Sequence, residues 1–203
     1  MSTATIKRYS PHEYLALERA AEHRSEFYRG EILAMPSGSR QHARICVNLT
    51  AEWQRALKGS PCQGFSGNMR VRVSPTGLYT YPDASVGCGE LRFEDAEVDT
   101  LLNPTIIFEV LSPSTESRDR GWKFDQYRQI PSLKEYVLLA QDQPRIERFE
   151  RSPDESWRWS FAQGMDSSIT IASIQQQILL REIYFDVEFI GAEGQPLPNA
   201  IRH

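Results

Sequence analysis

Large apolar residues recur every four positions in one segment of the chain. Within residues 40–58 they fall along one face of a helix, because an α-helix completes a turn about every 3.6 residues. The residues of this stripe are Ile45, Leu49, Trp53 and Leu57. Gly59 follows them and is expected to end the helix. We therefore predict a long amphipathic helix whose apolar face packs against a core.

A shorter helix and a hairpin are expected before this segment. Ser10 and Glu13 are spaced as a capping box, which predicts a helix over residues 11–20. Two short strands are predicted at 25–28 and 31–35, separated by an Arg-Gly turn. The N-terminal part of the chain should therefore add a helix and a hairpin to the core.

The remainder of the chain carries most of the predicted strands. The run at 105–111 is strongly apolar and rich in β-branched residues, which favours a buried strand. Further strands are predicted at 62–73, 80–86, 133–140, 145–150, 157–161 and 184–188, and helices at 119–129 and 173–180. This order predicts a single mixed α/β domain over residues 1–190. A tail at 191–203 is expected to be disordered.

Two carboxylates lie at strands of this predicted core. Asp83 follows Pro82 near the end of one predicted strand, and Glu109 lies inside the apolar run. A buried carboxylate is costly unless a cation or a hydrogen-bond network neutralises it. On neighbouring strands, the two would form an oxygen-lined pocket suited to Mg²⁺. The structural alternative is that Asp83 caps a turn and Glu109 pairs with an arginine.

The motifs that follow Glu109 resemble those of a known family. The chain reads Glu-Val-Leu-Ser-Pro-Ser-Thr from Glu109, Arg-Asp-x-x-x-Lys-x-x-x-Tyr from Arg118, and Glu-Tyr-Val from Glu135. With the Pro-Asp pair at Asp83, these motifs resemble restriction-endonuclease-like proteins that are abundant in cyanobacteria and belong to the PD-(D/E)XK nuclease superfamily. The resemblance spans residues 9–188.

This resemblance implies an α/β fold with a restriction-endonuclease-like mixed β-sheet core flanked by helices, and additional C-terminal strands. It also implies an endonuclease dependent on Mg²⁺ or Mn²⁺, in which Asp83, Glu109 and the Val110 backbone carbonyl bind the metal ion. His42 matches a family histidine at the start of the long helix and could hold a metal-bound water or a phosphate. DNA is the implied substrate, and cutting both strands implies a twofold homodimer.

One position departs from the superfamily pattern. Its Glu-x-Lys motif would place lysine at position 111, where this chain has Leu111. Lys123 on the next predicted helix is the best replacement, because a long side chain there can reach the strand ends, and Lys134 is the second choice. Of the hairpin carboxylates, Glu31 matches the family's Gly-Glu pattern better than Glu26. Both are considered because superfamily members often supply an early acidic residue to the metal ion, but an ordinary hairpin carboxylate is the preferred interpretation of each.

Composition bears on partners and location. The formal net charge of −4 weighs mildly against a nucleic-acid partner, although phosphate binding needs only local positive charge. Three cysteines without CxxC spacing indicate neither a disulfide framework nor a zinc site, so a cytoplasmic protein is expected. No apolar run is long enough to span a membrane.

Two other functions stay open at this stage. A non-catalytic descendant of the nuclease fold would serve as a nucleic-acid-binding or interaction module, and the missing strand lysine favours it. A carboxylate-pair hydrolase such as a glycosidase would use Asp83 and Glu109 without a metal ion.

Overall fold

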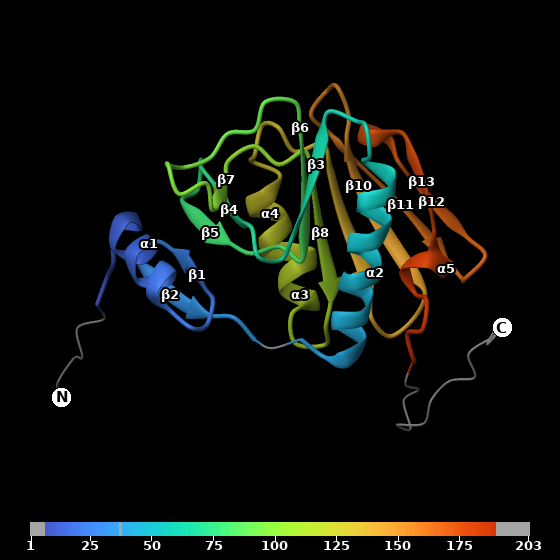
Figure 1. The fold of residues 1–203 in the computed structure, drawn as a ribbon, viewed down its shortest axis with the longest axis horizontal. Helices are drawn as coiled ribbons and strands as arrows, with labels where there is room; N and C mark the ends of the chain where they lie inside the picture. The colour runs from blue at the N-terminus through green and yellow to red at the C-terminus, as the bar shows by residue number, and fades with distance from the viewer. Residues whose placement is uncertain (1–6, 37, 190–203) are drawn as a thin grey trace.

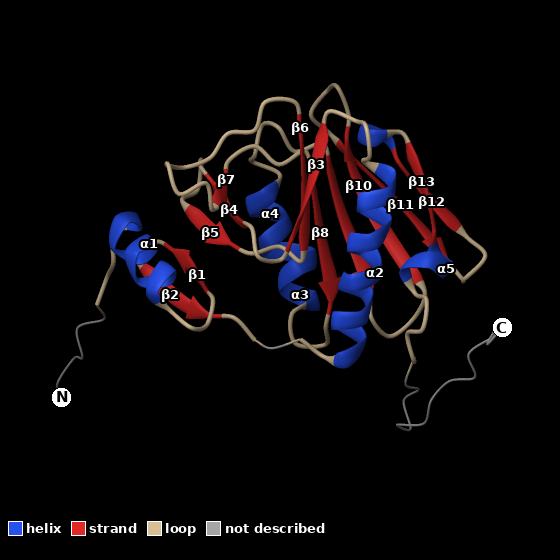
Figure 2. Ribbon diagram, viewed as in Figure 1, coloured by secondary structure: helices blue, strands red, loops and turns tan. Residues whose placement is uncertain are grey.

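The computed structural model describes residues 7–36 and 38–189 and confirms a mixed α/β architecture (Figure 1). Its strands form a six-stranded sheet, a five-stranded sheet and a two-stranded hairpin (Figure 2). The helical elements are α1 (Pro11–Ala20), α2 (Arg40–Ala56), α3 (Glu116–Arg118), the π-helical turn η1 (Asp119–Lys123), α4 (Phe124–Tyr127), the 3-10 turn η2 (Ala172–Ile174) and α5 (Leu180–Ile183). Within the described ranges, no helix is long and apolar enough to cross a membrane.

The six-stranded sheet carries most of the core. In spatial order its strands are β11 (Trp157–Gln163), β10 (Arg145–Arg151), β9 (Glu135–Ala140), β8 (Ile106–Leu111), β6 (Ala84–Cys88) and β3 (Cys62–Ser66). β8 and β9 run parallel, and the other neighbouring strands are antiparallel. A parallel pair needs a crossover connection, and the segment α3–η1–α4 lies in that connection.

The central strand β8 is buried along its whole length, as its unbroken apolar run predicts. On one face Trp53 of α2 packs against Phe108, with ring centroids 4.5 Å apart. On the opposite face Tyr127 of α4 packs in a cluster with Ile107 and Leu111. Alternate residues of β8 therefore point toward α2 and toward α4, which follows from the two-residue period of a strand.

The smaller sheet lies beside the N-terminal helix. Its strands, in spatial order, are β2 (Glu31–Ala34), β1 (Ser25–Tyr28), β5 (Leu78–Thr80), β4 (Arg70–Val73) and β7 (Thr100–Leu101). Tyr14 of α1 stacks on Phe27 of β1 with ring centroids 5.0 Å apart. The capping box of Ser10 and Glu13 is present, which confirms the predicted start of α1.

Strand boundaries differ from the predictions in three regions. The strand expected at 80–86 is divided between β5 and β6, which belong to different sheets. The single strand expected at 62–73 is two strands, β3 and β4, that belong to different sheets because a turn at 67–69 separates them. The helix expected at 173–180 is largely β13 (Gln176–Leu179), which pairs with β12 (Ser168–Ile171). Gln175, with φ 53°, ends the 3-10 turn η2 and lets the chain reverse into that pairing.

The C-terminal end of the fold also differs. The strand predicted at 184–188 is absent from the described residues, where the chain leaves α5 in a turn. Tyr184 and Val187 are buried there against the main core, so their apolar character reflects packing and not a strand. The tail expected at 191–203 lies outside the described residues.

The expectation that no cysteines are paired is wrong. Cys62 of β3 and Cys88 of β6 stand opposite each other in the antiparallel ladder, with Cα atoms 4.0 Å apart, and form a disulfide. Their separation of 26 residues carries no recognisable spacing, because strand register brings them together. The cytoplasmic location inferred from unpaired cysteines therefore loses its basis. Cys46 is the free cysteine.

Candidate active site

Glu109 and Lys123 meet beneath the central sheet. Glu109 of β8 is 3% exposed and points toward η1 and α4. Its Oε1 accepts hydrogen bonds from Lys123 Nζ at 3.0 Å and from the Tyr127 hydroxyl at 2.8 Å. Lys123 and Tyr127 are four residues apart, so both donors project from one side of the helical segment. A lysine is thus present at Glu109, although it comes from a helix and not from the strand.

Three carboxylates surround this lysine. Besides Glu109, Lys123 Nζ lies 3.3 Å from Asp119 Oδ1 and 3.7 Å from Glu26 Oε1, and the residue is 6% exposed. Burial acts to lower the pKa of Lys123, but the three carboxylates outweigh burial and raise it, so the ammonium stays charged. Asp119 and Lys123 are the two ends of η1, and π-helical turns are frequent at functional sites.

Glu26 reaches this cluster from the smaller sheet. It is 2% exposed, its Oε1 accepts a hydrogen bond from the Thr80 hydroxyl at 2.5 Å, and its Oε2 pairs with Arg118 at 2.5 Å. Glu31 instead pairs with Arg8 at the surface. Glu26, and not Glu31, therefore lies in this cluster, and the interpretation of Glu26 as an ordinary hairpin carboxylate does not hold. Both residues occupy four-residue strands of one hairpin, and only the packing of that hairpin separates them.

Asp83 is held at the start of β6 by two donors. Its Oδ2 accepts a hydrogen bond from the Val110 backbone N–H at 2.7 Å, and its Oδ1 lies 3.1 Å from His42 Nε2. His42 lies in the first turn of α2, where its own N–H donates to the Ser39 hydroxyl that caps the helix. The predicted site residues Asp83, His42 and Val110 are therefore in direct contact, with Val110 contributing its amide to this contact.

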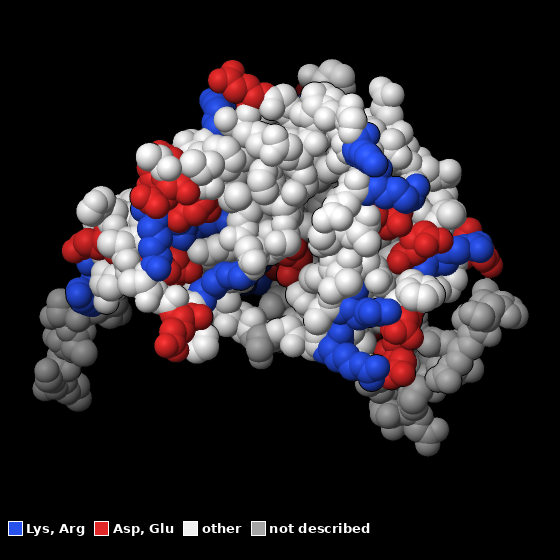
Figure 3. Space-filling model, in the orientation of Figure 1, with Lys and Arg blue, Asp and Glu red and all other residues white. Residues whose placement is uncertain are grey.

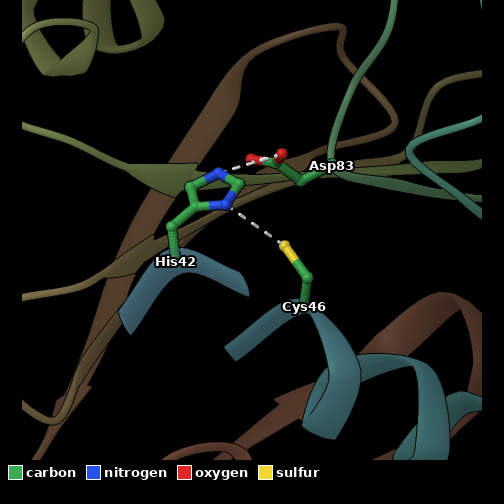
Figure 4. Close-up of side chains that lie close together, drawn as sticks. All are labelled: His42, Cys46 and Asp83. Carbon is green, nitrogen blue, oxygen red and sulfur yellow. Dashed lines mark hydrogen bonds and ion pairs between the residues drawn. The ribbon is translucent and has the colours of Figure 1, made fainter. Parts of the chain in front are cut away.

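Cys46 is an additional member that the sequence did not indicate. It follows His42 by one helical turn, and its Sγ lies 3.7 Å from His42 Nδ1. Figure 4 shows the imidazole between the thiol and the Asp83 carboxylate. Burial acts to lower the pKa of His42, but the hydrogen bonds with Asp83 and Cys46 raise it to about 10. The imidazolium is therefore the form present at neutral pH.

The two parts of the site adjoin each other through strand register. β6 and β8 pair Ala84 with Phe108, so Asp83 and Glu109 occupy the next opposed positions along the two strands. Burial raises the pKa of Glu109 to about 8, Lys123 opposes this, and the charges of Asp119 and Asp83 add to it. The cluster thus contains more carboxylates than its ammonium neutralises.

This excess of carboxylates fits a divalent cation with a preference for oxygen ligands. Asp119 Oδ1 is buried and, within the described part of the chain, receives no hydrogen bond beyond its ion pair with Lys123. Carboxylate oxygens are the donors that Mg²⁺ prefers, and a divalent charge would favour the ionised form of Glu109. The residues present therefore suit the metal ion that the sequence analysis expected.

The surface between the N-terminal part of the molecule and α2 is hollowed. Figure 3 shows a concavity between the α1–β1–β2 part of the molecule and the lower end of α2, in the region where Figure 1 places α3. Both acidic and basic side chains are visible inside it.

The sequence did contain a signal for the residues it missed. In the Arg-Asp-x-x-x-Lys-x-x-x-Tyr motif, Asp119, Lys123 and Tyr127 are spaced by four and lie on one side of the helical segment. No comparable signal marked Cys46. Lys134, the second choice for the lysine, is exposed and stays a surface residue.

The chain is similar over most of its length to two known proteins. Two uncharacterized proteins of Synechocystis sp., slr1290 and sll1609, are each 34% identical to the chain. The first alignment spans 155 residues, 76% of this chain and 80% of the relative. The second spans 169 residues, 83% of this chain and 96% of the relative.

A solved structure shares the fold. The crystal structure described as that of a putative nuclease belonging to DUF820 from Anabaena variabilis superposes with a TM-score of 0.69. It covers 85% of this chain and 96% of its own, at 16% sequence identity. Residues 11–180 also match the model of the family Uma2, described as "putative restriction endonuclease". With a match over most of its length, the chain belongs to the Uma2 family and has its nuclease-like fold.

Proposed function

We propose that this protein is an endonuclease that hydrolyses DNA phosphodiester bonds with the help of Mg²⁺ or Mn²⁺. The observation that carries the proposal is the hydrogen bond between Lys123 Nζ and Glu109 Oε1 at 3.0 Å. The strand position of the superfamily lysine holds Leu111, which is buried among apolar side chains. A helix residue nevertheless supplies a charged lysine beside the strand carboxylate.

Each site residue has a role in this proposal. Asp83, Glu109 and the Val110 carbonyl would hold the metal ion, which when bound would polarise the phosphate and lower the pKa of the attacking water. Lys123 would orient that water and offset the negative charge that develops on the phosphate. His42, as an imidazolium, would attract the phosphate near the N-terminus of α2.

The direct test is cleavage of supercoiled plasmid DNA with Mn²⁺ or Mg²⁺. We expect the wild type to nick or linearise the plasmid, and Glu109→Gln to eliminate cleavage, because it removes a carboxylate that would hold the metal ion. Lys134→Ala is the matched lysine control, because Lys134 is exposed and should leave the rate unchanged. Wild-type protein that cleaves no DNA at any concentration of either metal ion would refute the proposal.

One observation favours a second candidate, a non-catalytic module that binds nucleic acid. Lys123 and Glu109 are both almost completely buried and contact each other at 3.0 Å, and a purely structural pair would make the same contact. Under this alternative, the protein would bind duplex DNA without cleaving it, and Glu109→Gln would leave the binding affinity unchanged.

The proposed double-strand cut also requires two active sites of opposite orientation. A twofold homodimer supplies them, because a duplex presents two antiparallel strands. Light scattering with and without DNA should therefore detect a dimer. A protein that stays monomeric in both conditions would restrict the activity to nicking single strands.

A further inference from the structure

Three side chains of different chemistry converge at the N-terminal end of α2. His42 and Cys46 project from successive turns of the helix, and Asp83 faces them from the start of β6 (Figure 4). One ligand atom from each residue can be chosen so that all three lie within 4.8 Å of one another. A metal ion can be held by three or more histidine, cysteine, aspartate or glutamate side chains that lie this close together. Within residues 7–36 and 38–189, His42, Cys46 and Asp83 form such a group.

The distances are close to those of a tetrahedral metal site. Ligands bound at typical zinc–nitrogen and zinc–sulfur lengths stand about 3.6 Å apart when the angle between them is tetrahedral. His42 Nδ1 and Cys46 Sγ are 3.7 Å apart. Asp83 Oδ1 contacts the other ring nitrogen, Nε2, at 3.1 Å, so the imidazole or the carboxylate has to rotate before one ion can contact all three residues.

The surroundings hold two of these residues in position before any ion binds. The Val110 N–H fixes the Asp83 carboxylate, and the Ser39 cap fixes the first turn of α2 that carries His42. Gly38 approaches the imidazole so closely that a β-carbon there would lie 2.8 Å from His42 Nδ1. The backbone thus leaves just enough room for the ring in its present orientation.

The donor set selects a different class of ion from the one proposed at Glu109. Thiolate and imidazole ligands favour Zn²⁺ and similar borderline transition metals, whereas Mg²⁺ prefers oxygen alone. Three protein ligands leave the fourth tetrahedral position to water, which is the pattern of an open zinc site.

We propose that His42, Cys46 and Asp83 form a binding site for Zn²⁺ or a related thiophilic divalent ion. Cys46 is available as a ligand because it is the free cysteine, while Cys62 and Cys88 are joined to each other. Binding to this site does not depend on nuclease activity. One consequence does rest on the proposed function: since Asp83 serves both sites, Zn²⁺ would compete with Mg²⁺ and inhibit cleavage.

The test uses Co²⁺ as a spectroscopic substitute for Zn²⁺ on the metal-free full chain, without DNA and without a thiol reductant. We expect one equivalent of Co²⁺ to produce a thiolate-to-metal charge-transfer band, and one equivalent of Zn²⁺ to displace it. Cys46→Ser should abolish the band, and His42→Gln should weaken Co²⁺ binding at least tenfold. His23→Gln is the matched histidine control, because His23 is exposed, and it should bind like the wild type.

Glu109→Gln separates this proposal from the proposed nuclease. It should eliminate cleavage but keep the Co²⁺ band, because Glu109 is not one of the three ligands. Thermal melting of each metal-free variant verifies that it is folded before titration. A wild type without the band, a band retained in Cys46→Ser, or a band lost in Glu109→Gln would each overturn the proposed site.

Discussion

The two clusters around β8 differ in burial, in charge and in the atoms they present. Glu109 and Lys123 lie on the side of the sheet covered by α4 and are almost completely enclosed. His42 and Cys46 come from α2, which covers the opposite face, and both are only partly buried. Neighbouring residues of one strand serve both clusters, because the Glu109 side chain enters the first and the Val110 N–H holds Asp83 in the second.

The comparison shows how burial and charge balance together decide protonation. In the enclosed cluster, burial and an excess of carboxylates raise the pKa of Glu109 to about 8. In the partly exposed cluster, His42 is paired with Asp83 and its pKa is raised to about 10 although burial opposes this. The first cluster therefore retains a proton on a carboxylate, and the second retains one on an imidazole. A divalent ion has to displace a proton or a cation in either cluster.

The largest expected effect is on stability when the enclosed cluster loses its cation. Lys123→Ala leaves Glu109, Asp119 and Glu26 buried without their shared ammonium, so we expect a loss of about 3–5 kcal/mol in the free energy of unfolding. Urea denaturation measures this loss. The same substitution in a Glu109→Gln background should cost less, because one of the three carboxylates is already neutral. An additive double variant, or a loss below about 1 kcal/mol in the single variant, would show that the ion pairs contribute little.

The second-largest effect is expected in the pH dependence of stability, which should differ between the two clusters. The pKa of Glu109 is about 8 in the folded protein and 4.5 in the unfolded chain. Between these two pH values, Glu109 carries a proton in the folded protein that it has lost in the unfolded chain. Stability conferred by this proton is full below about 4.5 and is lost as the pH rises toward 8, by at most about 1.4 kcal/mol per pH unit. Glu109→Gln should remove this slope. His42 acts over a higher window, from 6.5 to about 10, in which its stabilisation of the folded state declines as the pH rises.

Urea denaturation of the wild type, Glu109→Gln and His42→Gln between pH 5 and 10 checks both windows. His23→Gln controls for the loss of an exposed histidine and should follow the wild type. If Glu109→Gln and His42→Gln flatten the same pH range, the two clusters titrate as one unit and the distinction drawn between them is lost.

The smallest effect is expected at Asp83. Asp83→Asn removes the ion pair with His42 and weakens the hydrogen bond from the Val110 N–H, so we expect a loss of about 1–3 kcal/mol without metal. Chemical denaturation at neutral pH measures this, with Asp125→Asn as a control at an exposed ion pair. An unchanged or higher stability would mean that repulsion between Asp83 and Glu109 outweighs the two contacts that Asp83 makes.

Particular residues show where prediction from the sequence succeeded and where it failed. The stripe Ile45, Leu49, Trp53 predicted α2, and the apolar run around Glu109 predicted the central strand, because burial imposes a regular spacing on each element. The strand at 62–73 and the helix at 173–180 failed. Each segment contains a turn with little apolar content, near residue 68 in the first and at Gln175 in the second. The turn ends one element, and the residues after it begin a different strand.

By itself, the sequence determined the mixed α/β class, the family, and the pair Asp83 and Glu109, because periodicity and motif spacing are properties of nearby residues. Only the tertiary structure decided that Lys123 binds Glu109, that Glu26 and not Glu31 joins them, and that Cys62 meets Cys88. Those contacts join residues from separate elements, so they depend on strand register and on the docking of a hairpin and a helix. Such contacts follow from how all the elements fill one core together, and no local pattern encodes them.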